Sequence, residues 1–380
     1  MELAGKREVL AEAFSTAQVI ATTRSTRPVL QNLLISASKE GVVITATDME
    51  IGLKWKIPVE DCTVKEEGTA LVSAARIAQI ARVVEAEEIS ISKREVSPDL
   101  SVETERREAP NCTVRAGRSV FDVVTERVED FPEVPDPPAK AALEIESDKF
   151  VLMTRKTVFA AAREATRYSL NGVYMEVKEG YLEMVATDGR RLAMVKERVP
   201  KDAKLAASIV PQKALSFVER LAQGGDGAFS ISVAERQIFF TGAKGTVVSR
   251  LVEGHFPPYS EVIPRESNRK ATISREGFIS ALRQALLMTS EDSKSALLSF
   301  AGEDLTLTSR APDEGSSEIK VGIKYEGDPI EIRFNPQFII DALAVTDSEE
   351  VTLEMKEPST PAVLKDRTGF LYVVMPIYIV

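Results

Sequence analysis

The sequence has very few of the residues that build metal sites and disulfide frameworks. Its 380 residues include one histidine, His255, and two cysteines, Cys62 and Cys112. A structural zinc site uses about four cysteine or histidine ligands, and a disulfide framework needs several cysteine pairs. A Ser-His-Asp triad could be built only on His255. The sequence therefore predicts no metal site, no cofactor and no disulfide scaffold, and a reducing compartment.

Long hydrophobic segments are also missing. No run reaches the roughly 18 apolar residues that a membrane-spanning helix requires. Residues 1–8 lack the apolar core of a secretory signal. We therefore expect a cytoplasmic protein with no membrane partner.

Positive charge is in deficit over the whole chain. Lys and Arg number 48 against 58 Asp and Glu, which leaves a net charge of -10. That sum argues against a polyanionic partner, because binding to nucleic acid depends on local positive charge. The charges are unevenly distributed, however: residues 85–88 and 347–350 are acid-rich, whereas residues 149–168 contain five basic residues and one acid. The net charge alone does not exclude DNA.

Three kinds of landmark recur in the same order along the chain, at spacings of about 120 to 140 residues. A strand ending in a polar turn is expected at 44–48, 184–188 and 305–309; a strand running into an amphipathic helix at 71–77, 209–215 and 333–339; and an apolar residue before proline at Phe131, Phe256 and Met375. The repeat is one small domain long. It predicts three domains, 1–137, 138–264 and 265–380, with the first boundary in the proline-rich stretch 133–138 and the second after Pro264.

Each repeat is predicted to be α+β, with a helix, strands, a second helix and more strands. The first helices show apolar stripes at Leu10, Phe14 and Ala17, at Val151, Val158 and Ala162 in a helix over about 150–168, and at Phe278, Leu282 and Leu286. Pro211 and Pro336 suit the first position of the second helices, and Asn335 is a good N-cap.

Four segments carry a resemblance to a known family: 167–172 (RYSLNG), 186–192 (ATDGRRL), 256–264 (FPPYSEVIP) and 372–376 (YVVMP). They resemble the bacterial sliding clamp, the beta subunit of the replicative DNA polymerase, over the whole chain and in order. The resemblance implies three tandem clamp domains, each with two helices packed on antiparallel sheets. It also implies a head-to-tail homodimer that forms a six-domain ring around double-stranded DNA. Such a clamp is a processivity factor and not an enzyme.

The resemblance also implies partners. The clamp would bind DNA without regard to sequence and would tether the replicative polymerase, other polymerases and repair proteins through short peptide motifs. A closed ring must be opened to be loaded, which implies an ATP-driven clamp loader. No GxxxxGK[ST] loop occurs in this chain.

Basic residues on the predicted helices are the candidates for contact with DNA phosphates. Lys156, Arg163 and Arg167 stand at i, i+7 and i+11 of one predicted helix and so share a face. Lys213 and Arg220 repeat the i, i+7 spacing. The complete candidate set is Arg24, Arg76, Arg82, Lys156, Arg163, Arg167, Tyr168, Lys213 and Arg220. Solvated helix faces are the alternative interpretation.

Two further sites are implied by the resemblance alone. Partner peptides would enter an apolar cleft between the second and third domains, where Gly189 leaves room, Met375 adapts to varied side chains and Arg191 holds a polar group at the rim. The cleft would be lined by Leu170, Thr187, Gly189, Arg191, Leu192, Pro257, Val262, Met375, Pro376 and Ile377. The dimer contact would join Phe121 and Val123 to Leu287 and Met288.

Three other interpretations stay open at this point. Asp48 and Asp188 could hold a metal ion in a phosphodiesterase, but both follow a strand at equivalent places in the repeat, where an Asx turn explains them. The chain could instead be a protein scaffold that never meets DNA, or a specialised clamp paralogue.

Overall fold

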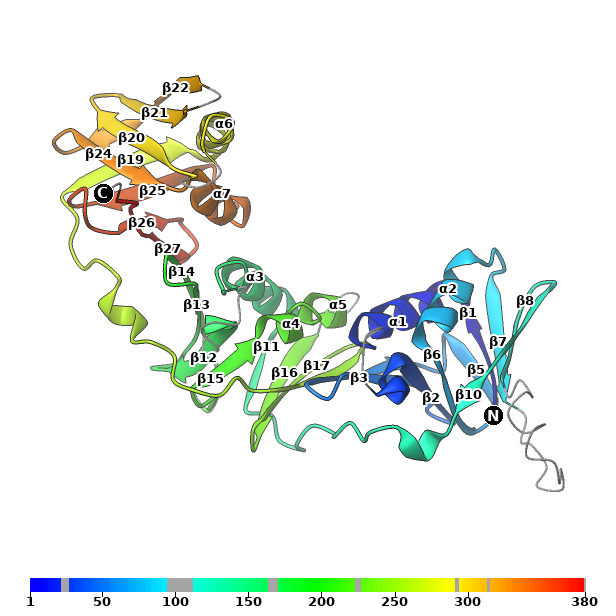
Figure 1. Ribbon diagram of the computed structural model, residues 1–380. Coiled ribbons are helices and arrows are strands. Elements are labelled where there is room, and N and C mark those ends of the chain that lie inside the picture. Colours follow the sequence, from blue (N-terminus) through cyan, green and yellow to red (C-terminus); the bar gives the residue numbers. More distant parts are fainter. Residues whose placement is uncertain are drawn as a thin grey trace. The chain divides into compact units, whose positions relative to one another are not determined.

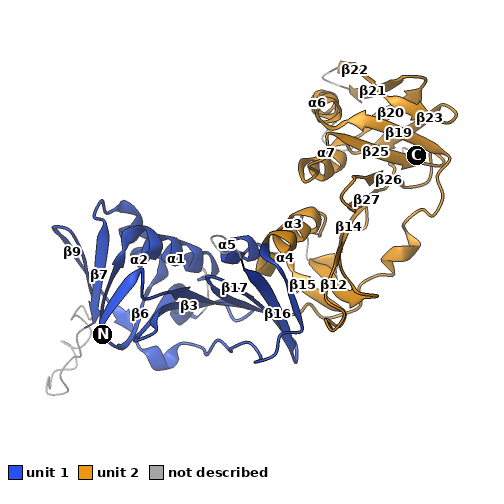
Figure 2. Cartoon of the chain, turned by 180° about the vertical axis from the view of Figure 1, so that it is seen from behind, with its two compact units in different colours: residues 1–147, 216–250 blue, residues 148–215, 251–380 orange. Residues whose placement is uncertain are grey.

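The computed structural model describes residues 1–21, 27–93, 112–162, 170–222, 227–290, 294–312 and 315–378. The chain forms two compact units (Figure 2): unit 1 contains Met1–Ser147 and Ser216–Arg250, and unit 2 contains Asp148–Leu215 and Leu251–Val380. Within the described residues the strands form four antiparallel sheets, two in each unit. The same residues include no helix long and apolar enough to cross a membrane.

Unit 1 contains a five-stranded and a nine-stranded sheet (Figure 1). The first has the order β5 (Cys62–Glu66), β1 (Glu2–Lys6), β7 (Glu88–Lys93), β8 (Cys112–Ala116) and β9 (Ser119–Val123). The second has the order β10 (Thr125–Glu126), β6 (Gly68–Ser73), β2 (Asn32–Ser38), β3 (Gly41–Thr47), β4 (Ile51–Ile57), β18 (Gly245–Arg250), β17 (Gln237–Gly242), β16 (Ala228–Ala234) and β11 (Leu143–Glu146).

Unit 2 contains a nine-stranded and a four-stranded sheet. The first has the order β15 (Ser208–Pro211), β12 (Gly172–Lys178), β13 (Tyr181–Thr187), β14 (Arg191–Arg198), β27 (Leu371–Val374), β26 (Ala362–Lys365), β25 (Glu350–Met355), β19 (Arg269–Ser274) and β23 (Lys324–Glu326). The second has the order β22 (Gly315–Gly322), β21 (Asp304–Ala311), β20 (Ala296–Ala301) and β24 (Ile330–Phe334).

Both nine-stranded sheets are built from two distant parts of the sequence. In unit 1, β4 pairs with β18, so that Gly52 faces Val248. In unit 2, β14 pairs with β27, so that Leu192 faces Val373. These two pairs, called here the first and the second junction, join successive parts of the repeat by continuous backbone hydrogen bonds. The landmarks of the sequence do not predict them.

The helices cover the sheets as the repeat predicts. α1 (Arg7–Ile20) packs against α2 (Ala74–Val83) and lies over β3 and β4, with Leu10 and Phe14 buried. α6 (Arg275–Leu286) packs against α7 (Pro336–Ala344) and β22, with Phe278 and Leu282 buried. Asn335 caps α7 by accepting a hydrogen bond from the amide of Gln337 at 3.0 Å, as predicted. The shorter helices are α3 (Ser147–Val158), α4 (Gln212–Leu215), α5 (Val218–Ala222) and the 3-10 turns η1 (Pro28–Gln31), η2 (Val128–Asp130) and η4 (Tyr259–Glu261).

Three details of the helix prediction are wrong. α3 ends at Val158 instead of near residue 168, and it buries Phe150 and Met153 while Val151 is only half-buried. The segment after Pro211 is not one helix but two short ones, α4 and α5. Pro211 itself ends strand β15. Apolar and basic residues continue at helical spacing in the sequence after Val158, although the helix ends there.

The three parts of the repeat share a basic order of elements. A strand precedes the first helix, three strands follow it, a further strand leads into the second helix, and three strands come after that. The first part adds β5 and β10 to this order, and the third part adds β23. By this order β4, β14 and β22 are equivalent, and so are β9, β18 and β27. The leading strands β1, β11 and β19 carry no landmark in the sequence, which therefore does not predict them.

Two equivalent turns confirm the structural interpretation of Asp48 and Asp188. The Oδ1 atom of Asp48 accepts hydrogen bonds from the amides of Glu50 and Ile51 at 3.0 and 2.7 Å. Asp188 accepts the amides of residues 190 and 191 in the same way, at 2.9 and 3.1 Å. Both are Asx turns that close the hairpins β3–β4 and β13–β14.

The residue after each of these aspartates has a left-handed backbone. Met49 has φ 77° and Gly189 has φ 86°. Glycine adopts this conformation without the steric cost that a side chain brings. Gly189 is therefore explained by its turn, whether or not a peptide approaches it.

Candidate partner cleft, DNA-facing residues and subunit contact

The predicted cleft residues gather around the second junction. Thr187, Gly189 and Arg191 belong to the β13–β14 turn, and the amide of Met375 donates a hydrogen bond to the carbonyl of Arg190 at 2.9 Å. Beneath them lies an apolar cluster of Val185, Leu192, Met194 and Val373, against which Phe256, Tyr259 and Ile263 pack. The structure thus brings residues from 187–192, 256–263 and 371–377 together in unit 2.

Only some of these residues present surface to solvent. Met375 is 38% exposed and Val262 46%, and Gly189 and Pro257 are also exposed. Leu192, Leu170, Thr187 and Pro376 are buried, and Ile377 is half-buried. Of the predicted cleft residues, Met375, Val262, Gly189 and Pro257 are therefore the most exposed.

A polar network fixes the segment that carries Val262. The hydroxyl of Tyr259 donates to Oε2 of Glu183 at 2.6 Å, and Nζ of Lys196 pairs with Oε1 of the same carboxylate at 2.5 Å. Burial favours the neutral acid, but the hydrogen bonds from Lys196 and Tyr259 hold the pKa of Glu183 below its usual value. The rings of Tyr174 and Phe256 stack beside Tyr259, with centroids 5.2 Å apart. The segment is therefore anchored to the sheet rather than free.

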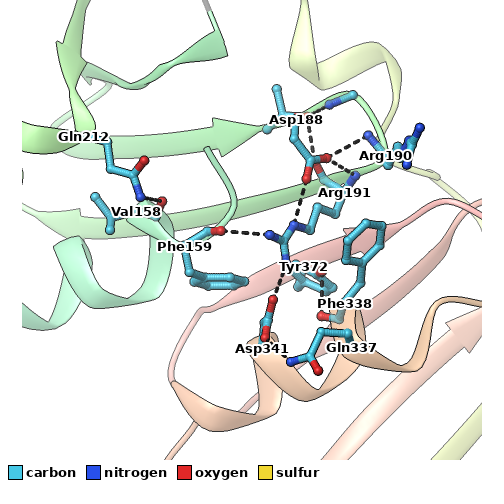
Figure 3. A network of polar contacts seen from close by, with 12 residues as sticks. Val158, Phe159, Asp188, Arg190, Arg191, Gln212, Gln337, Phe338, Asp341 and Tyr372 are labelled. Atoms are coloured by element: carbon cyan, nitrogen blue, oxygen red, sulfur yellow. Dashed lines mark hydrogen bonds and ion pairs between the residues drawn. The ribbon is translucent and has the colours of Figure 1, made fainter. Parts of the chain in front are cut away.

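Arg191 does not stand at the rim of the cleft (Figure 3). Its side chain is 8% exposed and lies between β14 and α7, where Nε donates to Asp188 at 2.9 Å and Nη1 to Asp341 at 2.6 Å. Nη2 donates to the carbonyl of Phe159 at 3.0 Å. The guanidinium also lies over the ring of Phe338, 4.6 Å from its centroid. The predicted position at the rim is wrong, because these bonds engage the guanidinium inside the unit; contact of Arg191 with a peptide stays a prediction.

The surroundings of Arg191 keep it charged. Burial disfavours the cation, but Tyr372, Asp341 and Asp188 raise the pKa of Arg191 above its usual value. Asp341 is not among the residues that the sequence singles out. It is the one charged residue of α7, and a single charge on an otherwise neutral helix is the signal that could have indicated it.

Lys156 is also an internal residue, and its predicted contact with DNA is wrong. Its side chain is 1% exposed, and Nζ lies 3.1 Å from Oδ2 of Asp366 and 2.6 Å from the hydroxyl of Thr368. Nζ also lies 5.6 Å from the centre of the Phe370 ring. Burial favours neutral Asp366, but bonds from Thr368 and Lys156 hold the pKa of this carboxyl below its usual value. Lys156 and Arg191 both bind residues of the last third of the chain to the middle third.

The remaining DNA candidates fall into two groups. Arg76 and Arg82 are exposed on α2, which carries no acid, and Lys213 and Arg220 are exposed on α4 and α5. Because α4 and α5 are separate helices, Lys213 and Arg220 do not lie on one helix as predicted. Arg24, Arg163, Arg167 and Tyr168 lie outside the described residues.

The candidate subunit contacts lie at two sheet edges. Phe121 and Val123 belong to β9, an edge strand of the five-stranded sheet, beside a groove of 750 Å³ that Ile80 and Val83 of α2 also line. Leu287 follows α6, which packs on the edge strand β22, and is 71% exposed. Met288, next to it, is half-buried. An exposed apolar side chain and an apolar groove therefore occur beside different strand edges.

Family models of the DNA polymerase III beta subunit match the chain in three consecutive segments. The N-terminal domain matches residues 1–135, the central domain 144–258 and the C-terminal domain 260–378. The chain belongs to the DNA polymerase III beta subunit family. This establishes three clamp domains, although the boundaries at 137/138 and 264/265 stay a prediction.

Similar proteins agree with this family. The chain is 30% identical to the beta sliding clamp of Pseudomonas aeruginosa, with 98% of each covered. It is 29% identical to that of Chlamydia muridarum, with 99% of this chain and 98% of the other covered. A solved structure of the P. aeruginosa sliding clamp bound to griselimycin superposes with a TM-score of 0.89 at 29% identity and covers 100% of both chains.

Membership of this family confirms the predicted function class. Sliding clamps are non-catalytic processivity factors of DNA replication, so the phosphodiesterase interpretation of Asp48 and Asp188 has no support. Within the described part of the chain, no three potential ligands are grouped to hold a metal ion. The function of the protein therefore depends on its surfaces and not on reactive groups.

We expect Lys156→Met to lower the free energy of unfolding of unit 2 by about 3 to 5 kcal/mol, because a buried Asp366 would lose its counter-charge. Lys156→Met with Asp366→Asn should recover most of this loss. Urea denaturation measures both. As a control, Lys149→Met removes a 3.5 Å pair with Glu197 at the surface and should change stability by no more than about 1 kcal/mol.

The pH dependence gives a second readout of the same pair. Because the pKa of Asp366 is lowered in the folded chain, its stabilising effect is present above its ordinary pKa of 3.8 and is lost as the pH falls through the folded value. The double variant should lack this acid-dependent loss. Equal destabilisation of the single and double variants would contradict the role assigned to the pair.

Proposed function

We propose that two copies of the chain close into a ring around double-stranded DNA through a third junction formed in trans. The observation that carries this proposal is the arrangement of sheets. The first and second junctions each complete a nine-stranded sheet, whereas the outer sheets have five and four strands. Joining the edge strand β22 of one copy to β9 of the other would make a third sheet of nine.

The order of elements supports this pairing. β22 is equivalent to β4 and β14, and β9 is equivalent to β18 and β27, so the trans contact would repeat the pairings seen at the first two junctions. Exposed strand edges of this kind need a partner or protection. The contact is heterologous, since it joins different surfaces of the two copies. Two three-domain chains can therefore close into a ring of six domains.

Side chains beside the two edges support the same contact. At the second junction Phe159, which follows α3, lies against Tyr372, with ring centroids 5.8 Å apart. Leu287 follows α6 in the equivalent place. The apolar groove beside β9 would receive it, as Tyr372 and its neighbours receive Phe159. We therefore propose Phe121, Val123, Leu287 and Met288 as subunit contacts.

DNA would be held without regard to sequence by basic residues on helices. We propose Arg76, Arg82, Lys213 and Arg220 for contact with phosphates, on the grounds that they are exposed on helices, whereas the acid-rich segments 85–88 and 347–350 lie outside the helices. A ring holds DNA by topology, so a few weak phosphate contacts are enough and allow sliding.

Polymerases, repair proteins and a clamp loader would dock at the second junction, in the cytoplasm. The anchors proposed for their peptides are Met375 and Val262, because these are exposed apolar side chains above a buried apolar floor. A flexible methionine adapts to varied partner side chains. The scaffold interpretation, without DNA, is distinguished from the clamp by the charge test below.

Sedimentation tests the ring contact. The wild-type protein should sediment as a dimer of about twice 41.6 kDa, and Leu287→Asp should shift it to the monomer, since a buried charge without a partner opposes association. Val59→Asp is the matched control, because Val59 is 52% exposed in a turn away from either edge strand. A dimer in the Leu287→Asp protein would refute the contact.

Charge reversal tests the DNA-facing residues. The protein with Arg76→Glu, Arg82→Glu, Lys213→Glu and Arg220→Glu should show weaker retention on circular DNA. The slope of log affinity against log salt should fall by about 0.9 for each phosphate that the variant no longer neutralises. The control reverses four exposed lysines in turns and loops: Lys39, Lys140, Lys201 and Lys204. Equal retention by the two proteins, both dimeric, would exclude this lining.

Partner binding tests the cleft. Met375→Ala with Val262→Ala should weaken binding of a labelled polymerase-tail peptide by about 2 kcal/mol or more, since a few anchors dominate such interfaces. Fluorescence anisotropy measures the affinity. Leu152→Ala on α3 is the control, because Leu152 is similarly exposed, at 39%. Unchanged affinity in the double variant would show that the cleft lies elsewhere.

A further inference from the structure

The first junction contains a positional counterpart of the candidate partner cleft. Its β3–β4 turn repeats four hydrogen bonds of the β13–β14 turn. Among them, Thr47 Oγ1 donates to the carbonyl of Ile51 at 2.9 Å, and Thr187 Oγ1 donates to that of Arg191 at 2.6 Å. The counterpart is reduced to a cavity of 110 Å³ between this turn, the end of β18 and the segment Glu133–Pro135.

One residue distinguishes the floors of the two sites. Gly52 faces Val248 at the first junction where Leu192 faces Val373 at the second. A Cβ atom on Gly52 would lie 2.7 Å from Cγ1 of Val134 and 2.8 Å from Cγ1 of Val248. Real Cβ contacts are essentially never so short. The glycine is needed for space, and Val134 fills the place where Leu192 carries its side chain.

Val134 belongs to a segment that lies on the sheet as a bound peptide would. Val134 is 6% exposed and packs with Phe239 and Val248, whereas its neighbour Glu133 is exposed. Two residues on, Asp136 pairs with Lys54 at 2.6 Å. A cavity of 360 Å³ remains beside the segment, between it and the outer face of β2–β4. Val134, as the one buried side chain of the segment, and the Asp136–Lys54 ion pair hold the segment, and the packing beside it is incomplete.

We infer that the segment 131–136 is a built-in peptide ligand of this counterpart site, anchored by Val134 in the notch above Gly52, and that it closes the first junction to peptides from other proteins. Calling the site a counterpart depends on the cleft proposed at the second junction. The tethered segment has an effective concentration on the order of millimolar, so free peptides at micromolar concentration do not displace it.

A peptide added in trans tests the inference. The probe is a labelled synthetic peptide of residues 131–138 (FPEVPDPP), titrated by anisotropy into the full-length protein. Wild type should not bind it in the micromolar range. The Val134→Gly, Asp136→Ser chain, whose own segment has lost its anchors, should bind it at least about tenfold more tightly. Equal binding to the two proteins would overturn the inference.

Two controls locate the bound peptide. Adding Gly52→Ala to the anchor-free chain should abolish binding, because the new methyl group fills the notch. Adding Met375→Ala and Val262→Ala should leave it unchanged, because these residues belong to the second junction. The opposite pattern would place the peptide in the second cleft and overturn the inference. If the polymerase-tail peptide failed to bind wild type, that result would contradict the cleft proposed at the second junction and not the binding of residues 131–136 at the first.

Hydrogen exchange gives a measurement on a nearly native chain. Gly52→Ala should expel Val134 and speed amide exchange in residues 131–136 by about tenfold or more, since weaker packing lowers the cost of local opening. Gly227→Ala, just before β16, is the matched control, because a Cβ there meets nothing within 4 Å. Unchanged exchange in the Gly52→Ala protein would mean that Val134 does not depend on the notch.

Discussion

The architecture depends on one constraint, the pairing of backbone groups at strand edges. Each third of the chain builds two half-sheets, and each half-sheet ends on a strand whose amides and carbonyls need partners. At β4–β18 and β14–β27 the partner is the next part of the same chain. A junction of this kind is directional, because it fixes the register of the two strands. It lets successive small domains share one continuous sheet.

The two junctions have the same backbone pairing, but their side chains differ. At the second, two internal cations bind the middle third of the chain to the last third: Arg191 to Asp341 and Lys156 to Asp366. Both cations look like surface charges in the sequence. Their burial has a functional consequence, because a cleft for partner peptides keeps its shape only if its two walls do not separate. Lys156, which the sequence assigns to DNA, thus serves cohesion in the structure.

Much of the fold could be predicted from the sequence, because the repeat marks each copy with local signals. The Asx turns at Asp48 and Asp188 and the N-cap at Asn335 are formed by neighbouring residues, and all three are confirmed. Contacts between distant segments leave no such local signal. Burial of Lys156, 210 positions from Asp366, depends on the junction, and spacing along a presumed helix could not indicate it. The partner cleft was placed by resemblance, and only the structure separated its exposed anchors from its buried floor.

Repetition with local change explains how one chain can carry several surfaces. Three equivalent joints are available to the proposed ring. At the first, Gly52 admits Val134 and the chain covers its own site. At the second, Leu192 fills the floor, leaving Met375 exposed above it. At the third, neither β9 nor β22 has a second neighbour among the described strands, and we propose that a second copy supplies it. The residue in the floor, glycine or leucine, thus distinguishes the joint that we propose to accept its own linker from the one that we propose to accept a partner.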